Sequence, residues 1–332
     1  MPTTMRDVAH KAGVSIKTVS RVVNDQGEIS DRTRQRVLAA IDDLRYRPSR
    51  VARALVTQSS YTIGLVTVDI NNPFFPEVAQ GVIETAREKG YNVFLCNTDG
   101  SPDQELSTLQ SLADNSVDGI IFYPTYESGV TLEQFVEQYQ PIVVLNYDFE
   151  DHRVSQVMLD SCLGAKLAVD YLVGLGHQSI GMITGVQDIS EGKVRRVDGY
   201  REAMRHHNIS IDESWIMPGA EPTVEVGYET TKQLLVSQPE ISAIFTYNDL
   251  LAIGALKACH ELSLSVPQDC AIIGFDDIQF SAMVIPSLST VRIDKYDLGR
   301  QATNRLFDML KEPDKAYPPI TVKPELIIRE ST

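Results

Sequence analysis

The stretch from Val8 to Asn24 carries side chains whose types and spacing suit contact with the edges of DNA bases. At about 100° per residue, the segment after Ser15 has one apolar half and one half with long donors and an exposed aliphatic residue. Arginine and lysine can bond guanine in the major groove, and aliphatic carbon can contact a thymine methyl group. The predicted DNA-contacting set is Ser15, Ile16, Lys17, Thr18, Ser20, Arg21 and Asn24.

A second set of polar and aromatic residues follows the predicted strands of the rest of the chain. In open α/β sheets, ligands bind beyond the carboxyl ends of the strands. A carboxylate there can accept two hydroxyl hydrogen bonds, an arginine suits an anionic group, and an aromatic ring can cover a sugar or base. The plainer alternatives are packing in the core for Phe74 or Phe75 and capping of the next helix for Asp276 or Asp249. The predicted ligand-contacting set is Phe74, Phe75, Asn146, Arg196, Asn248 and Asp276.

Three short helices are expected to position the first set. Gly13 allows the left-handed backbone of a sharp turn between two helices. Thr4 and Asp7 have the spacing of a capping box for the first helix, and Ser30 can cap a third. Residues 1–46 are therefore predicted to form an all-α helix-turn-helix headpiece, whose second helix enters the major groove. Its third helix has apolar residues at core spacing, which are Val37, Leu38, Ile41 and Leu44.

The charge of the 332-residue chain is distributed unevenly. Residues 1–58 hold eleven Lys/Arg and six Asp/Glu, a balance of +5, whereas the remainder holds nineteen and thirty-nine, a balance of −20. The net charge of the whole chain is −15. A basic segment on an acidic body suits phosphate contact at one end only. The length allows two or three domains, and the 43% hydrophobic content supports well-filled cores.

Residues 47–58 connect the headpiece to the rest of the chain. The segment contains Pro48, two arginines, small alanines and Leu55. Composition alone is compatible with either a linker or a short helix that begins after the proline.

From Tyr61 onward, apolar strand runs alternate with amphipathic helices, which is typical of open parallel sheets with helices on both faces. Two such series predict two similar subdomains with a cleft between them. Strands are predicted at Thr62–Val68, Asn92–Cys96, Gly119–Tyr123, Ile142–Leu145, Ile180–Thr184, Ala243–Thr246 and Ala271–Phe275. Helices are predicted at Phe75–Lys89, Cys162–Leu175, Arg196–His207, Leu250–Leu262 and Leu298–Leu310.

The motifs expected of an enzyme are absent or broken. Gly174 and Gly176 begin a dinucleotide-like pattern, but Ser179 replaces the third glycine and the order of elements is reversed. Neither a G-x-S-x-G elbow nor an H-E-x-x-H metal motif occurs. The four cysteines are scattered, so we expect no metal site, redox pair or cofactor.

The chain opens without a basic-then-apolar leader, and no apolar run approaches the ~18 residues that a membrane span needs. A reduced cytoplasmic location is therefore expected. Two alternatives to a DNA-binding regulator remain open from the residues alone. These are a solute-binding protein of a transporter, which a secretory leader would favour, and a cytoplasmic α/β enzyme.

Three segments together resemble the LacI (lactose-repressor) family of bacterial transcription regulators, over essentially the whole chain. They are VSIKTVSRVVN, SDRTRQRVLAAIDDLRYRPSRVARAL and IGLVTVDINNPFF. The resemblance implies a repressor that binds two-fold symmetric operator DNA as a homodimer and responds to a small carbohydrate-like effector. It implies no membrane partner. It implies a body like periplasmic sugar-binding proteins, with one subdomain over 60–159 and 292–320 and the other over 160–291 and 321–332.

The resemblance also assigns roles to single residues. Residues 47–58 become a hinge helix on DNA, in which Leu55 wedges into the minor groove, Ala52 makes the close helix–helix contact and Arg50 flanks them. Arg196, Asn248 and Asp276 match the family's ligand-holding positions. Asn146 and Ile293 depart from the aspartate and glutamine that many sugar-binding members carry, so the resemblance implies no particular sugar.

Overall fold

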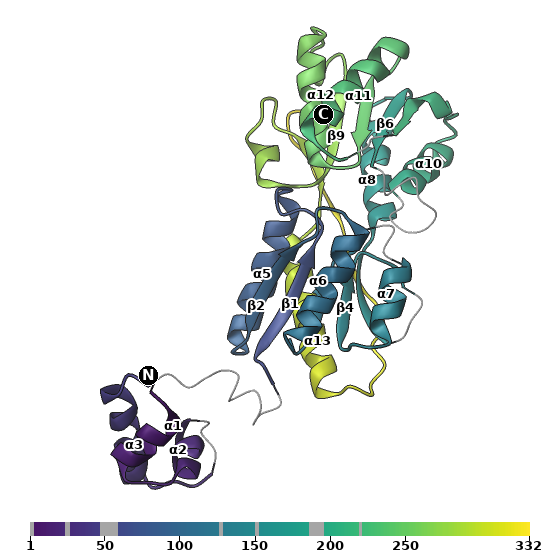
Figure 1. Cartoon of the computed structure of the whole chain (residues 1–332). Coiled ribbons are helices and arrows are strands. Elements are labelled where there is room, and N and C mark those ends of the chain that lie inside the picture. Colours follow the sequence, from purple (N-terminus) through teal and green to yellow (C-terminus); the bar gives the residue numbers. More distant parts are fainter. Residues whose placement is uncertain are drawn as a thin grey trace. The chain divides into compact units, whose positions relative to one another are not determined.

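The structure is a computed structural model that describes residues 3–23, 27–46, 59–125, 129–149, 153–185, 196–218 and 221–332. The chain separates into two compact units, residues 1–62 with 116–118 and residues 63–115 with 119–332, which we describe one at a time (Figure 1). The predicted hinge, 47–58, lies outside the described residues. So do four members of the DNA-contacting set, namely Asn24, Arg50, Ala52 and Leu55.

The headpiece contains helices α1 (Met5–Ala12), α2 (Ile16–Val23) and α3 (Asp31–Asp43). Gly13 has a φ of +62°, which confirms the left-handed turn between α1 and α2. The capping box of Thr4 and Asp7 is present, and the Ser30 side chain accepts a hydrogen bond from the Thr33 amide. The local signals therefore set the ends of these helices as predicted.

The headpiece core is small and apolar. It is formed by Val8, Ala9, Ala12, Val19, Val22, Val37, Ala40 and Tyr46. The prediction that Leu38 belongs to this core is wrong, because it follows Val37 by one residue and turns about 100° away, leaving half of its surface exposed. Arg36 ties α3 to the turn, since its guanidinium donates to the carbonyls of Ala12 and Gly13.

The body contains two six-stranded sheets (Figure 1). The first has the order β11-β5-β4-β3-β1-β2, and its strands from β11 to β1 pair in parallel. Its strands are β1 (Thr62–Thr67), β2 (Asn92–Asn97), β3 (Ile120–Phe122), β4 (Ile142–Leu145), β5 (Val154–Leu159) and β11 (Ile320–Val322).

The second sheet has the order β12-β10-β9-β8-β6-β7 and is parallel except for the β10–β12 pair. Its strands are β6 (Ile180–Thr184), β7 (Ile216–Pro218), β8 (Ala243–Thr246), β9 (Ala271–Asp276), β10 (Ser289–Arg292) and β12 (Glu325–Ile327). The sequence prediction omitted β5, β7, β10, β11 and β12. Three of these are only three residues long, too short to show a period.

Helices cover both faces of each sheet. In β1, Ile63 and Leu65 join the core formed with α5 and α13, whereas Gly64 between them lies against Leu112 of α6. In β8, Phe245 faces α8 and α10, and Ile244 faces α11 and α12. The helices are α5 (Phe74–Glu88), α6 (Pro102–Asp114), α7 (Gly129–Val136), α8 (Ser161–Gly174), α10 (Arg196–His206), α11 (Val224–Ser237), α12 (Asp249–Glu261) and α13 (Lys295–Lys311), with 3₁₀ turns η1 (Glu213–Trp215) and η2 (Gln279–Ala282).

The chain passes between the sheets three times. The first change follows β5, which ends at Leu159. The second follows Arg292, which pairs with Asp276 in the second sheet, so the expected start of the returning segment at 292 is one residue early. The third follows Val322, because β11 pairs with β5 in the first sheet.

Helices α5 and α13 pack at close range on the first sheet. A Cβ on Gly81 would lie 2.1 Å from the Tyr296 carbonyl oxygen, and one on Gly299 would lie 2.2 Å from that of Val78. Only glycine permits this approach, which sets the start of α13 beside α5. No helix among the described residues is long and apolar enough to cross a membrane.

Candidate functional site

Helix α2 divides its residues between core and solvent as the sequence predicts. Val19 and Val22 are buried, whereas Ile16, Lys17 and Arg21 are exposed. The helix therefore presents two cations and one aliphatic side chain away from the headpiece core.

Three smaller members of the set contribute to the start and the side of α2. The Ser15 hydroxyl accepts the Thr18 amide at 3.1 Å and lies 2.9 Å from the Thr18 hydroxyl, so Ser15 caps the helix. Ser15 is exposed, and Thr18 and Ser20 are half-buried. Their short side chains leave the longer Lys17 and Arg21 as the groups with the greatest reach.

The body contains a cavity of about 380 Å³ at the carboxyl ends of both sheets. Its volume lies at the lower end of the ~300–1,000 Å³ typical of small-molecule sites. Residues from both subdomains line it, as expected for ligands of open α/β sheets. They are Val68, Asp69, Asn71, Asn72, Phe74, Phe75, Asp99, Gly100, Tyr123, Arg196, Glu221, Pro222, Thr223, Tyr247, Asn248 and Asp276.

Arg196 begins α10 and is held rigidly in this wall. Its guanidinium carbon lies 4.1 Å from the Tyr247 ring centre and 3.9 Å from that of Phe275. Nη1 donates to the Tyr247 carbonyl at 2.8 Å, and Nη2 is 3.4 Å from Asp276 Oδ1. The stacking and the ion pair offset the cost of burying this cation and fix its orientation toward the cavity.

Asp276 ends β9 with its side chain 7% exposed. Burial raises the pKa of its carboxyl to about 6, although the charges of Arg196 and Lys295 oppose the rise. The backbone φ of Asp276 is +108°, an uncommon value for a residue other than glycine. The carboxylate is therefore held at a specific position on the cavity wall.

The aromatic residues form one cluster that is both core and wall. Phe74 and Phe75 begin α5, and the centres of their rings lie 5.3 Å apart in edge-to-face contact. Each also meets the Tyr123 ring edge to face. Phe74 and Phe75 are under a tenth exposed. The two phenylalanines therefore pack in the core and also line the cavity, and their contact with a ligand stays a prediction.

Two predicted ligand residues are engaged in other contacts. Asn146 does not line the cavity: its Nδ2 donates to the Tyr123 hydroxyl at 2.9 Å, so Tyr123 stands in the wall and Asn146 behind it. Asn248 does line the cavity, but its Oδ1 accepts the Leu251 amide and caps α12. Only the Nδ2 group of Asn248 is left to donate to a ligand.

The wall is acidic, with Asp69, Asp99, Glu221 and Asp276, and Arg196 is the single basic side chain among the described residues that line it. The sequence prediction missed Asp69 and Asp99, although each follows a predicted strand, and it missed Tyr123, the last residue of the predicted strand Gly119–Tyr123. It missed Glu221 because β7 was not predicted. Within the described residues, no group of three or more His, Cys, Asp or Glu side chains is arranged to hold a metal ion.

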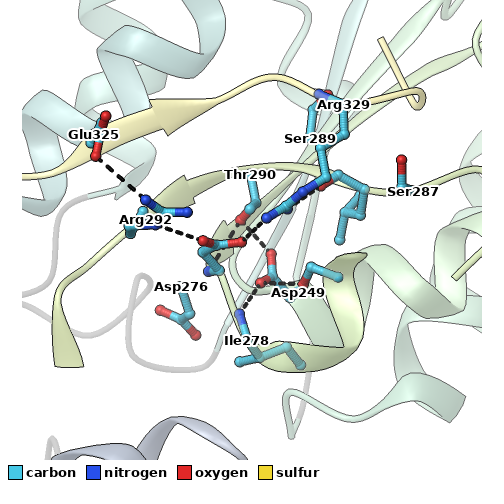
Figure 2. Close-up of polar contacts among 12 residues, drawn as sticks. Asp249, Asp276, Ile278, Ser287, Ser289, Thr290, Arg292, Glu325 and Arg329 are labelled. Atoms are coloured by element: carbon cyan, nitrogen blue, oxygen red, sulfur yellow. Dashed lines mark hydrogen bonds and ion pairs between the residues drawn. The ribbon is translucent and has the colours of Figure 1, made fainter. Parts of the chain in front are cut away.

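Asp249 begins α12 next to the cavity-lining Asn248 and joins the loop after β9 to this helix (Figure 2). Its carboxylate accepts the Ile278 amide at 2.8 Å, the Ser281 hydroxyl at 2.7 Å and the Thr290 hydroxyl at 2.5 Å. The residue is fully buried, and burial is the largest cause that raises the pKa of Asp249 to about 7, followed by the charge of Asp276. By sequence alone, Asp249 is only a possible cap of the next helix.

We expect Asp249→Asn to remove a contribution to the free energy of unfolding of the body that falls between pH 4 and pH 7. The folded chain keeps a proton on Asp249 up to about pH 7, whereas an unfolded aspartate loses it near pH 3.8. The contribution of Asp249 to the free energy of unfolding therefore falls as pH rises through this window, by up to about 1.4 kcal/mol per pH unit. Asparagine has nearly the shape of aspartate but carries no titrating group.

Urea unfolding at pH 5, 6, 7 and 8, followed by fluorescence of the single tryptophan, Trp215, measures this difference. Parallel stability curves for wild type and Asp249→Asn would contradict the prediction. Asp269→Asn is the control, because Asp269 is an exposed carboxylate just before the other end of β9.

Comparison with known proteins agrees with both parts of the fold. Residues 4–49 match the family model of bacterial regulatory proteins of the lacI family, and residues 169–332 match a periplasmic binding protein-like domain. The chain is 37% identical to the HTH-type transcriptional repressor PurR of Histophilus somni, with 99% of this chain and 98% of that protein covered. It is 36% identical to the ribose operon repressor of Halalkalibacterium halodurans, with coverage of 99% and 97%.

Two solved structures extend the comparison. The lac repressor dimer bound to operator and the anti-inducer ONPF matches with a TM-score of 0.88 and 26% identity, over 100% of this chain and 99% of that one. A LacI-family regulator from Enterococcus faecium with bound ribose matches with a TM-score of 0.72 and 27% identity, over 82% and 98%.

The headpiece, the two-subdomain body and these matches define a DNA-binding transcription repressor with a ligand-binding body. The chain belongs to the LacI family of bacterial regulatory proteins. Members of this family are transcription regulators rather than enzymes, so the enzyme and transporter alternatives are set aside.

Proposed function

We propose that this repressor places α2 in the major groove of a two-fold symmetric operator in the cytoplasm. Arg21 and Lys17 then bond base edges, Ile16 contacts a thymine methyl group, and Ser15, Thr18, Ser20 and Asn24 complete the contacts. The exposure of Ile16, Lys17 and Arg21 on one side of a helix supports this role. The basic balance of residues 1–58 supports contact with phosphates.

The proposal includes a hinge at residues 47–58 that orders on DNA. Leu55 enters the minor groove as an apolar wedge, Ala52 permits close pairing with the hinge of the second copy, and Arg50 contacts the DNA backbone. Apolar wedges flanked by basic residues are a general device of minor-groove binding. A segment this short needs DNA and its partner to become helical, because an isolated helix of about a dozen residues or fewer is marginal in water.

The proposed effector is a small, neutral, polyhydroxylated molecule such as a pentose. The observation that carries this proposal is the acidic wall, in which four carboxyl groups face one arginine already stacked and paired with Asp276. Such a wall accepts hydroxyl hydrogen bonds and repels phosphate groups. The similarity to a ribose operon repressor and to a regulator with bound ribose also supports a neutral sugar as the effector.

Operator binding by the full-length protein tests the proposal. DNA flanking its own gene is titrated in a gel-shift assay with ribose, other neutral monosaccharides, sugar phosphates and purine bases. We expect a neutral sugar to change the affinity and sugar phosphates to have no effect. A response to purine bases alone would replace the sugar proposal, and equal binding to operator and random DNA would overturn the regulatory role.

We propose further that the second copy packs on two exposed apolar groups of the body. One lies on β2, the edge strand of the first sheet, and comprises Phe94 and Leu95 with nearby Ile70. The other lies between β9 and β10 and comprises Phe280, Met283 and Ile285, the last 94% exposed. An open strand edge and a cluster of exposed apolar side chains are typical of an interface. The dimer in the lac repressor structure supports a second copy as the occupant.

Ile285→Glu is expected to weaken the homodimer and to lower operator affinity by at least about tenfold, because a charge then replaces an apolar contact at a dimer-dependent site. Analytical ultracentrifugation and the gel-shift assay measure the two effects. Val236→Glu is the control, since Val236 is 71% exposed on α11, outside both groups. Unchanged dimerisation in Ile285→Glu would place the interface elsewhere.

A further inference from the structure

Lys295 is a buried lysine at a place where the local chain does not favour one. It begins α13 directly after the capping residue Asp294, and its side chain is 3% exposed. The start of a helix disfavours a cation, and a buried ammonium group is costly unless it is well paired. Tertiary contacts must therefore account for this residue type.

The ammonium group binds a turn that belongs to the other subdomain. Lys295 Nζ donates to the carbonyl oxygens of Asp276 at 2.7 Å and Asp277 at 2.8 Å. It also lies 3.5 Å from Glu77 Oε2 on α5. Lys295 and Glu77 belong to α13 and α5, which pack on the first sheet. The Asp276–Asp277 turn lies at the end of β9, in the second sheet. One side chain thus links both subdomains directly behind the ligand-facing carboxylate.

The turn itself requires such support. Asp276 and Asp277 have φ values of +108° and +53°, and two successive non-glycine residues with positive φ are unfavourable unless other contacts hold them. Arg329 and Arg292 donate to the Asp277 carboxylate at 2.6 and 2.7 Å (Figure 2). Lys295 binds the two backbone carbonyl oxygens of the turn. The backbone that carries the Asp276 side chain is therefore held by Lys295 and by the two arginines on Asp277.

We propose that Lys295 is a positioning residue, which holds the Asp276–Asp277 turn from the other subdomain and thereby aims the Asp276 carboxylate at the effector. The inference rests on the proposed role of Asp276 in effector binding. It adds that the effector-binding carboxylate of one subdomain is positioned by a cation of the other, so the geometry of the site depends on how the subdomains meet.

The charge of Lys295 also acts on Asp276 through space. The titratable groups coupled to Asp276 come from four helices and from the segment that follows β3. They are Arg196 and Lys295, which lower its pKa, Glu77, which raises it, and Asp249 and Tyr123, whose pKa values Asp276 raises in turn. Removal of the Lys295 charge must therefore raise the pKa of Asp276 above about 6.

The first test measures the pH profile of ribose binding to the full-length protein by calorimetry. In wild type, affinity should fall as pH drops through about 6, because protonated Asp276 no longer accepts two hydroxyl bonds. Lys295→Met should move this midpoint up by about one pH unit and weaken binding at pH 8 about tenfold. Lys295→Arg should restore the midpoint. A lower affinity with an unchanged midpoint would mean that Lys295 merely supports the fold, and would overturn the proposal.

The second test needs no ligand. Urea unfolding is followed by Trp215 fluorescence for wild type, Lys295→Met, Asp276→Asn and the double variant, at pH 5 and pH 8. At pH 8 the loss of stability from Lys295→Met should be larger with Asp276 present than in the Asp276→Asn background. The difference should shrink at pH 5, where Asp276 is protonated. Equal losses in both backgrounds at both pH values would overturn the proposal.

The two tests also separate this inference from the proposed function. If wild type does not bind ribose but the pH-dependent coupling is found, the choice of ribose fails and the positioning of Asp276 by Lys295 stands. If ribose binds and the coupling is absent, the proposed function stands and the role of Lys295 fails.

Discussion

Asp276→Asn should abolish the response of operator binding to a sugar effector and leave operator binding without effector nearly unchanged. The carboxylate lines the cavity, pairs with Arg196 and can accept two hydroxyl bonds. Each charge-assisted bond contributes about 1.5–3 kcal/mol, so their loss should lower effector affinity on the order of a hundredfold or more. Asparagine tolerates positive φ better than most residues, so the turn at Asp276 should persist.

The measurement is operator affinity with and without effector, alongside calorimetry of effector binding to the full-length protein. Because an effector shifts DNA affinity only through its different affinities for two body conformations, loss of binding must remove the shift. Asp269→Asn is the matched control, an exposed aspartate just before the opposite end of β9. Normal effector binding by Asp276→Asn would show that the site lies elsewhere.

Arg21→Ala should reduce affinity for the operator about tenfold to a hundredfold and affect random DNA much less. A guanidinium bonded to a base edge contributes on the order of 1–3 kcal/mol of discrimination, whereas a phosphate contact contributes equally on every sequence. Arg21 is exposed in the last turn of α2, so its truncation leaves the headpiece core intact.

Fluorescence anisotropy at fixed salt measures the affinity for operator and for scrambled DNA. The ratio of the two affinities shows whether Arg21 reads a base edge or contacts only phosphate. Arg32→Ala serves as the control, because Arg32 is exposed at the start of α3, outside α2. Any loss from that variant should be the same on both sequences. Equal losses on operator and scrambled DNA for Arg21→Ala would show that Arg21 contacts phosphate only.

The amino-acid sequence by itself determined the parts of this protein that depend on near neighbours. Gly13, the capping box and the apolar spacing set the headpiece helices because caps and helix periodicity act within one or two turns. The strands Ile142–Leu145, Ile180–Thr184 and Ala243–Thr246 have the predicted bounds because they are continuous apolar runs, buried on both faces. The alternation of strands and helices also predicted two subdomains with a cleft between them, and the family resemblance matched Arg196, Asn248 and Asp276 to ligand-holding positions.

Tertiary structure alone decided how distant residues meet in the site. Asn146 and Tyr123 both follow strands, yet only Tyr123 lines the cavity, because a hydrogen bond between them holds the amide behind the ring. Arg196 is oriented by two rings and a carboxylate from other elements, and the 276–277 turn is held by Lys295 at the start of α13 in the other subdomain. Such contacts join residues far apart in sequence, and they depend on strand order and packing that no local pattern encodes.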